Sequence, residues 1–262
     1  MKIVYSEYLK DYSSYTFSYA PYCMYEKGDK LEDIYHLGFL PYTGNVHLDS
    51  YMCYMARSLR VDLEGFKRSS ENRRVDRKFE GISFDREIIP IEEFDILDPH
   101  FTKFCTDYSK ERFKGGEMSA DRLQYVLNSP FATHIIKYSE GDNHIAFILA
   151  CMNDSMLHYW YSFFSLDRYI ELPLGKWLML DSIEMAKETG RNYCYLGTCY
   201  GAHSLYKVRD FKSLEFFDGM GWKSDVKCLK AWCKSDDEPL SEDRFKSLDD
   251  GSANKILNEL KS

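Results

Sequence analysis

The chain has 262 residues, a formal net charge of −8 and an aromatic content of 16%. This length is enough for one large domain or two modest ones with a sizeable core. Proteins that hold long duplex nucleic acid by its backbone are usually basic, so the charge argues against a general DNA binder but leaves local contact with an RNA end open. The sequence has no apolar run of the ~20 residues that a membrane span needs, and residues 1–10 carry no apolar stretch of signal-peptide type. We therefore expect a cytoplasmic protein that does not contact a membrane.

The cysteines and histidines do not follow a metal-binding pattern. The eight cysteines are scattered without a C-x-x-C pair, and the seven histidines show no spacing such as H-E-x-x-H. Free thiols that behave as small core residues are the usual state of cysteines in a chain without an export signal. The sequence therefore predicts no bound metal and no resident cofactor.

The N-terminal third alternates between short predicted elements and turns. Residues 14–20 alternate as a strand does, residues 30–37 have one apolar helical face that ends at Gly38, and residues 46–63 contain another predicted strand. Residues 57–78 then hold eight Lys or Arg against four Asp or Glu. Such a segment is either a solvated helix face with mixed ion pairs or a patch that faces phosphate groups.

The middle of the chain changes from helices to strands. Residues 79–99 have the acids and prolines of a surface connection, and helices are predicted over 100–113 and 119–128, with Ser119 as an N-cap and a turn at Gly115-Gly116. Short turns then separate the predicted strands 133–139, 144–152 and 156–164, which is typical of an antiparallel meander.

The last predicted elements form a crossover. A helix over 175–189 ends at Gly190, and an aromatic strand follows over 192–196, so the strands before and after this helix are expected to pair in parallel. A polar loop at 204–207, a strand over 226–234 and a short helix over 251–262 complete the prediction.

This order of elements is typical of a GNAT-type acyltransferase. We predict an α+β (α/β) fold with a mixed sheet flanked by helices. Residues 99–235 would form the GNAT-like acyltransferase domain, residues 1–98 a smaller N-terminal α+β region that contacts acceptor or tRNA, and residues 236–262 a polar tail.

Several ordered motifs connect the chain to a known family. They are Tyr159–Phe164, Leu174-Gly175-Lys176, Tyr193-Cys194-Tyr195-Leu196-Gly197, Ser204-Leu205-Tyr206-Lys207 with Phe211 and Glu215, and Gly221-Trp222. More loosely matching positions are Gly38–Gly44, Arg60-Val61, Phe66, Ser69 and Arg73-Arg74-Val75. In these motifs the chain resembles the aminoacyl-tRNA–protein transferases of the N-degron pathway, of the arginyl or leucyl type, which carry a GNAT-like domain. Two departures stand out. Ser204-Leu205 replaces the family's Lys-Met, and Cys23 and Cys53 match only two of the four family cysteines that bind iron–sulfur or zinc in many members.

The resemblance implies an activity and a set of site residues. An amino acid would pass from an aminoacyl-tRNA, the co-substrate, to the N-terminal amine of an acceptor protein that begins with Asp or Glu, which marks that protein for degradation. The catalytic candidates are Tyr206, Lys207 and Glu215. The substrate-binding candidates are Tyr159, Tyr161, Gly175, Tyr195, Gly197, His203 and Phe211, and the tRNA-binding candidates are Arg68, Arg73 and Arg74.

Each candidate also has a simpler interpretation. Lys207 would hold an acidic side chain or a terminal phosphate, or else be a solvated lysine. The tyrosines would stack on the terminal adenine, or else pack in the core. Glu215 would orient the amine, or else lie on a helix surface.

Two other functions remain open from the sequence. One is acetyl-CoA-dependent N-acetylation, although Gly175 is a single glycine where a pyrophosphate loop needs several backbone donors. The other is a non-enzymatic scaffold that binds peptide N-termini or RNA. The amino acid that is carried, the acceptor residue and the oligomeric state are left open by the sequence.

Overall fold

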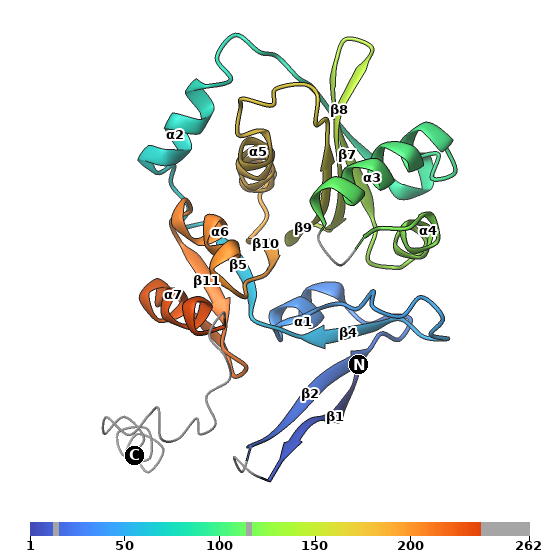
Figure 1. Ribbon diagram of the computed structural model, residues 1–262, viewed down its shortest axis with the longest axis vertical. Coiled ribbons are helices and arrows are strands. Elements are labelled where there is room, and N and C mark those ends of the chain that lie inside the picture. The colour runs from blue at the N-terminus through green and yellow to red at the C-terminus, as the bar shows by residue number, and fades with distance from the viewer. Residues whose placement is uncertain (13–15, 114–116, 237–262) are drawn as a thin grey trace.

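The structure is a computed structural model that describes residues 1–12, 16–113 and 117–236. The turn expected at Gly115-Gly116 and the helix expected over 251–262 lie outside these residues, as does all of the predicted tail except residue 236. Two sheets organise the described chain: a four-stranded sheet in the order β1-β2-β4-β3 and an eight-stranded sheet in the order β12-β11-β5-β10-β9-β8-β7-β6. The α+β class with a large mixed sheet flanked by helices is confirmed (Figure 1).

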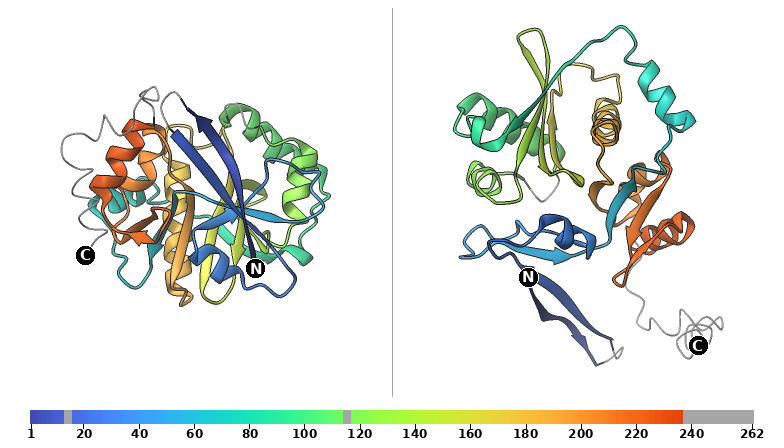
Figure 2. Two further views of the ribbon diagram at one scale, coloured as in Figure 1. Left: turned by 90° about the horizontal axis from the view of Figure 1, so that it is seen from below. Right: turned by 180° about the vertical axis from the view of Figure 1, so that it is seen from behind.

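The smaller sheet is antiparallel throughout and comes from the N-terminal region. It consists of β1 (Lys2–Asp11), β2 (Thr16–Met24), β3 (Phe39–Pro41) and β4 (Met52–Met55). The expected helix is present as α1 (Leu31–His36) and is followed by Gly38, whose φ of +81° favours glycine. A Cβ on Gly38 would lie 2.3 Å from the ring of Phe217, so glycine lets this region pack closely on the large sheet. The small sheet lies at one end of the molecule (Figure 2).

The larger sheet contains the predicted meander and crossover. The meander consists of β7 (His134–Glu140), β8 (Asn143–Met152) and β9 (Met156–Phe164). The crossover helix α5 (Leu174–Glu188) then leads to β10 (Tyr193–Thr198), which pairs with β9 in parallel. Both predictions are confirmed, and β9–β10 is the only parallel pair among the strands that the structure describes.

Two strands join this sheet from before residue 98. β5 (Ser58–Asp62) inserts between β10 and β11, and β6 (Asp85–Pro90) forms an edge beside β7. The large sheet therefore crosses the predicted boundary between residues 98 and 99. The prediction of a connection over 79–99 was wrong for β6, because an edge strand keeps exposed charged side chains such as Arg86 and Glu87 and so has the composition of a surface loop.

Helices cover both faces of the large sheet. One face packs on α5, and the opposite face packs on α3 (Pro99–Arg112) and α4 (Ala120–Leu127) (Figure 1). Ser119 is the N-cap of α4, as predicted. The helix α2 (Ser70–Arg77) lies beside α5 and belongs to the basic segment. A 3-10 turn (Ile91–Glu93) precedes α3.

The C-terminal elements complete one edge of the sheet. They are a 3-10 turn (Ala202–Leu205), α6 (Tyr206–Arg209), β11 (Leu214–Phe217), β12 (Trp222–Lys223) and α7 (Val226–Ser235). The strand predicted over 226–234 was wrong. The Asp225 carboxylate accepts hydrogen bonds from the amides of Lys227 and Cys228, and the buried residues Leu229 and Cys233 are four apart, so helical capping and spacing prevail over the apparent alternation. Among the described residues, no helix combines the length and apolar character needed to cross a membrane.

Candidate functional site

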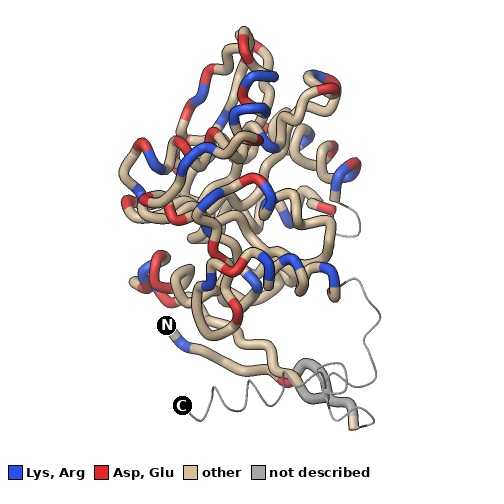
Figure 3. Tube along the Cα trace, turned by 90° about the vertical axis from the view of Figure 1, so that its left-hand side faces the viewer, with Lys and Arg blue, Asp and Glu red and all other residues tan. Residues whose placement is uncertain are grey.

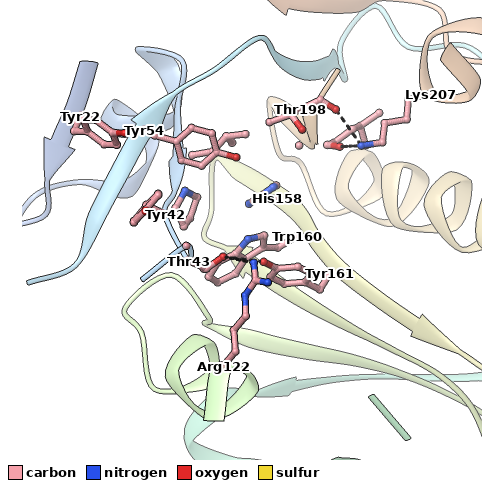
Figure 4. Close-up of a pocket in the computed structure, with 15 residues that line it drawn as sticks. Tyr22, Tyr42, Thr43, Tyr54, Arg122, His158, Trp160, Tyr161, Thr198 and Lys207 are labelled. Atoms are coloured by element: carbon pink, nitrogen blue, oxygen red, sulfur yellow. Dashed lines mark hydrogen bonds between the residues drawn. The ribbon is translucent and has the colours of Figure 1, made fainter. Parts of the chain in front are cut away.

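A cavity opens where β9 and β10 separate. Their parallel pairing covers only Tyr193–Tyr195 against Met156–His158, after which β9 continues to Phe164 and β10 ends at Thr198. The space between them holds a cavity of about 410 Å³ (Figure 4). Its walls come from the small sheet and its loops, from β9, from the end of β10, from α4 and from α6; the lining residues include Tyr22, Tyr42, Thr43, Tyr54, Arg122, His158, Trp160, Tyr161, Leu196, Gly197, Thr198 and Lys207.

A bulge in β9 decides which aromatic residues reach this cavity. On the partner strand β8, Ala150 pairs with Tyr159 and the adjacent Leu149 pairs with Tyr161, so Trp160 is an additional residue in β9. The bulge reverses the alternation. Tyr159 is 6% exposed and packs in the core under α5, whereas Trp160 and Tyr161 both line the cavity. Of the two tyrosines expected in the cleft on this strand, only Tyr161 lies there.

Lys207 closes the end of β10. Its Nζ donates to the backbone carbonyls of Leu196 at 3.0 Å and Thr198 at 3.2 Å. Between them, Gly197 has a φ of +77° at an irregularity in the pairing with β5, a conformation that favours glycine. Burial lowers the pKa of the Lys207 ammonium. Gly197 and Lys207, both predicted site residues, are thus brought together at the cavity.

A polar chain crosses the opposite wall of the cavity. Arg122 on α4 donates through Nη2 to Thr43 Oγ1 at 3.0 Å, and Thr43 Oγ1 lies 3.1 Å from the phenol oxygen of Tyr161 (Figure 4). Sequence reasoning missed Arg122 and Thr43 because they are 79 positions apart and neither belongs to a local motif. The described residues that line the cavity include Arg122 and Lys207 but no Asp or Glu, so the site favours a ligand with negative charge.

His158 is the most deeply buried polar residue of the cavity wall. It is 1% exposed, and its Nδ1 lies 2.9 Å from the phenol oxygen of Tyr35. The other ring nitrogen, Nε2, has no hydrogen-bond partner among the described residues. Burial, with a smaller contribution from Lys207, lowers the pKa of His158 to about 3, so the imidazole is neutral at physiological pH.

Known proteins are similar to the part of the chain that carries most of this site. Residues 99–212, which contain α3 to α6, match the family model described as arginine-tRNA-protein transferase, C terminus. This part of the chain is therefore similar to the C-terminal domain of aminoacyl-tRNA–protein transferases, and the expected resemblance to that family is confirmed.

Bacterial aspartate/glutamate leucyltransferases are similar over about two thirds of the chain. The similarity to an aspartate/glutamate leucyltransferase of Sphingomonas elodea is 26% identity, over 65% of this chain and 67% of the relative. For the enzyme of the same name from Rhizorhabdus wittichii it is 29% identity, over 65% and 66%. The chain thus spans about two thirds of the length of these relatives. Among solved structures, L-PGS from Bacillus licheniformis is similar with a TM-score of 0.39 and 16% identity, over 67% of this chain and 53% of that chain.

Two predicted site residues lie in a separate cluster instead of the cavity. Arg60 on β5, which is 4% exposed, donates to Glu215 at 2.7 Å, and its guanidinium stacks on Tyr193 at 3.8 Å and on Trp222 at 4.0 Å. Tyr195 is buried beside Trp222. We call these five residues the Arg60 cluster. Glu215 and Tyr195 therefore contact this cluster and do not line the cavity, and Glu215 lies on a strand and not on a helix.

The other substrate-binding candidates also lie outside the cavity wall. Gly175 begins α5 beside the ring of Phe164, where a Cβ would approach that ring to 3.0 Å. Phe211 is buried in the core that packs on α5. His203 lies just before α6 and is exposed. The catalytic candidate Tyr206 is the first residue of α6, directly before Lys207, and is also exposed.

The arginines expected to contact tRNA have protein partners. Arg68 forms ion pairs with Asp76 and Glu184, Arg74 pairs with Glu71, and Arg73 donates to the backbone carbonyl of Arg68. Basic and acidic residues are interspersed along the trace in Figure 3. These contacts fit the mixed-pair interpretation of the basic segment, and tRNA contact by Arg68, Arg73 and Arg74 stays a prediction.

The remaining family cysteines do not assemble a metal site. Cys23 and Cys53 lie directly opposite each other on β2 and β4 and are both buried. Among the described residues, no cluster of three or more His, Cys, Asp or Glu could hold a metal ion. Two thiols do not fit a four-ligand iron–sulfur or zinc site, and the prediction of no bound metal stays an expectation.

Proposed function

We propose that the cavity between β9 and β10 binds the aminoacyl end of an aminoacyl-tRNA together with the N-terminal amine of an acceptor protein, and that the amino acid is transferred to this amine. The observation that carries the proposal is the cavity itself: it opens between two parallel strands and is lined by aromatic rings, two cationic side chains and no acidic one among the described residues. The similarity of residues 99–212 to the C-terminal domain of arginine-tRNA-protein transferases supports the reaction class.

The reaction places modest demands on the protein. The ester that joins the amino acid to tRNA is already activated, so positioning of the amine and stabilisation of the developing oxyanion are the main contributions. Lys207 is held against the end of β10 by two carbonyls, which fixes a positive charge at the cavity wall. Trp160 and Tyr161 supply flat faces that suit the terminal adenine of the tRNA.

We propose further that the acceptor begins with Asp or Glu and that its modification marks it for degradation. Arg122 and Lys207 complement a carboxylate, and the guanidinium of Arg122 is already oriented by Thr43. The relatives named aspartate/glutamate leucyltransferase agree with this choice.

The lining residues favour leucine over arginine as the transferred amino acid. An arginyl group would bring a guanidinium into a cavity where the described wall has no carboxylate to pair with it. Leucine needs only apolar and aromatic surface, which Leu40, Trp160 and Leu196 provide.

A transfer assay tests the proposed function. The purified chain is incubated with labelled leucyl-tRNA, arginyl-tRNA or acetyl-CoA, and with peptides that begin with Asp, Glu, Asn or Gln. We expect transfer from leucyl-tRNA to the Asp and Glu peptides, with the isosteric Asn and Gln peptides as matched controls. Transfer from acetyl-CoA alone would replace the proposal by N-acetylation, and peptide binding without transfer from any donor would indicate a binding scaffold.

The tRNA contact and the role in degradation need separate measurements. If Arg73 and Arg74 contact phosphates, each Ala variant should weaken tRNA binding and reduce its salt slope by about one. In cells, a reporter that begins with Asp should become shorter-lived when the protein is present, whereas a reporter that begins with Asn should not.

A further inference from the structure

His158 combines deep burial with an unpaired polar atom in the wall of the cavity. Its imidazole is central among the labelled residues of Figure 4, between Thr198 on one side and Trp160 on the other. It is 1% exposed, yet Nε2 has no partner in the described part of the chain. A buried polar nitrogen without a partner is unfavourable, so a residue of this kind in a cavity wall points to a ligand atom that completes it.

The contact on the other side of the ring determines which nitrogen carries the hydrogen. Burial raises the pKa of Tyr35 well above its usual range, so its phenol keeps its hydrogen and needs an acceptor. The available acceptors are His158 Nδ1 at 2.9 Å and the nearby thiol of Cys151, and sulfur is the weaker acceptor. The Tyr35 hydroxyl therefore donates to Nδ1, which leaves the ring hydrogen on Nε2.

We propose that His158 is a catalytic residue whose Nε2–H donates a hydrogen bond to the carbonyl oxygen of the aminoacyl ester. This inference rests on the proposed transferase function and assigns a new role within its site. A donor fixed in a water-poor site stabilises the charge that develops on that oxygen in the transition state. The neutral imidazole carries its hydrogen on Nε2, and the lone pair of Nδ1 accepts from Tyr35, so the ring acts toward the ester as an electrophile and not as a base.

His158 keeps the same protonation state throughout the transfer of the amino acid. The lone pair of the acceptor amine forms a bond to the ester carbon, and the carbonyl π pair moves onto the oxygen that faces Nε2–H. When this intermediate collapses, the bond from carbon to the 3′ oxygen of the terminal ribose breaks, and its electron pair stays on that oxygen. The proton lost by the amine nitrogen ends on the 3′ oxygen. The products are an amide and a tRNA with a free 3′-hydroxyl.

Substitution of His158 separates a donor role from a packing role. The measured quantity is the single-turnover transfer rate from leucyl-tRNA to an Asp peptide at saturating concentrations. His158→Leu should lower it on the order of 100-fold, as loss of one oxyanion donor does in other enzymes. His158→Gln places an amide N–H near the position of Nε2 and should retain the rate to within roughly tenfold of the wild-type protein.

Tyr35→Phe provides a second test that keeps the imidazole in place. Removal of the hydroxyl frees Nδ1 to carry the hydrogen, so the ¹⁵N chemical shifts of His158 should change from the Nε2–H tautomer to a mixture and the transfer rate should fall. The melting temperature shows whether each variant is folded. If His158→Leu does not fold, Tyr35→Phe still tests the proposal.

The outcomes distinguish this inference from the proposed function. A wild-type rate in folded His158→Leu, or an Nδ1–H tautomer in the wild-type protein, would overturn the role of His158 while leaving the transferase function intact. A wild-type protein that transfers nothing from any aminoacyl-tRNA would overturn both the function and the catalytic role. The tautomer would still be read from the ¹⁵N shifts.

Discussion

Aromatic and cationic side chains gather at both ends of β10. The two ends differ in how many of the polar groups have partners within the protein. At the start of the strand, the Arg60 cluster encloses a cation between aromatic rings and pairs it with Glu215. At the end of the strand, the cavity presents Lys207, Arg122 and aromatic rings without any described acidic side chain, and Nε2 of His158 has no hydrogen-bond partner within residues 1–12, 16–113 and 117–236. A buried cation whose contacts all come from the protein stabilises the fold, whereas a buried polar atom in a cavity wall that lacks a described partner, such as Nε2 of His158, marks a position for a ligand.

Removal of Arg60 should have the largest effect on stability. Arg60→Met leaves Glu215 without its ion-pair partner and removes the stacked cation, so we expect a loss of about 3–5 kcal/mol in the free energy of unfolding. Urea unfolding measures this loss. Because the double variant with Glu215→Met removes both charges, it should recover part of the loss, and the Arg60 cluster would not be structural if Arg60→Met were as stable as the wild-type protein.

Removal of Lys207 should separate activity from stability. Lys207→Met should lower the transfer rate on the order of 100-fold, because the cavity loses a fixed positive charge. It should also destabilise the fold by about 1–3 kcal/mol, because two carbonyls lose their donor. Transfer assays and thermal unfolding measure the two effects. The matched control is Lys212→Met, an exposed lysine outside the cavity, and equal effects of the two substitutions would exclude Lys207 from the site.

The buried imidazole of His158 should make the free energy of unfolding depend on pH. His158 titrates near 6.5 in an unfolded chain and near 3 in the folded protein, so between these values the unfolded chain binds one additional proton. The contribution to stability is complete above pH 6.5 and is lost as the pH falls. From pH 6.5 to 5, the wild-type protein should lose about 2 kcal/mol more than His158→Gln. Parallel stability curves for the two proteins would contradict the neutral, buried state of His158.

Substitution of Arg122 should have the smallest of these effects and the most selective one. Arg122→Gln should raise the KM for an Asp peptide about tenfold, because it removes the charged hydrogen bond that we propose between Arg122 and the acceptor carboxylate. The KM for an Asn peptide should hardly change, and neither should the melting temperature. Arg77→Gln on α2 makes the same change of charge away from the cavity and serves as the control. An equal loss for both peptides would assign Arg122 to cavity architecture.

Local sequence patterns determined much of the fold. The short turns between alternating runs predicted β7, β8 and β9, and the amphipathic stretch with Gly190 at its end predicted α5 and hence the parallel strand β10. The ordered motifs around Tyr193–Gly197 and Tyr206–Lys207 indicated a resemblance to the transferase family, which the family model confirms over residues 99–212. These features depend on residues that are close in the chain, where periodicity and turn chemistry act directly.

Only the tertiary structure decided how β10 divides the candidate residues. The insertion of β5 beside β10 brings Arg60 to Glu215 and Tyr195, so these two residues belong to the Arg60 cluster. The bulge at Trp160 sends Tyr159 into the core and Tyr161 into the cavity, and a one-residue shift of this kind is not visible in an aromatic run. Arg122, Thr43 and His158 meet in the cavity from distant parts of the chain. Their roles arise from burial and from partners that the sequence pattern does not specify, because a side chain's environment is set by whichever distant elements pack against it.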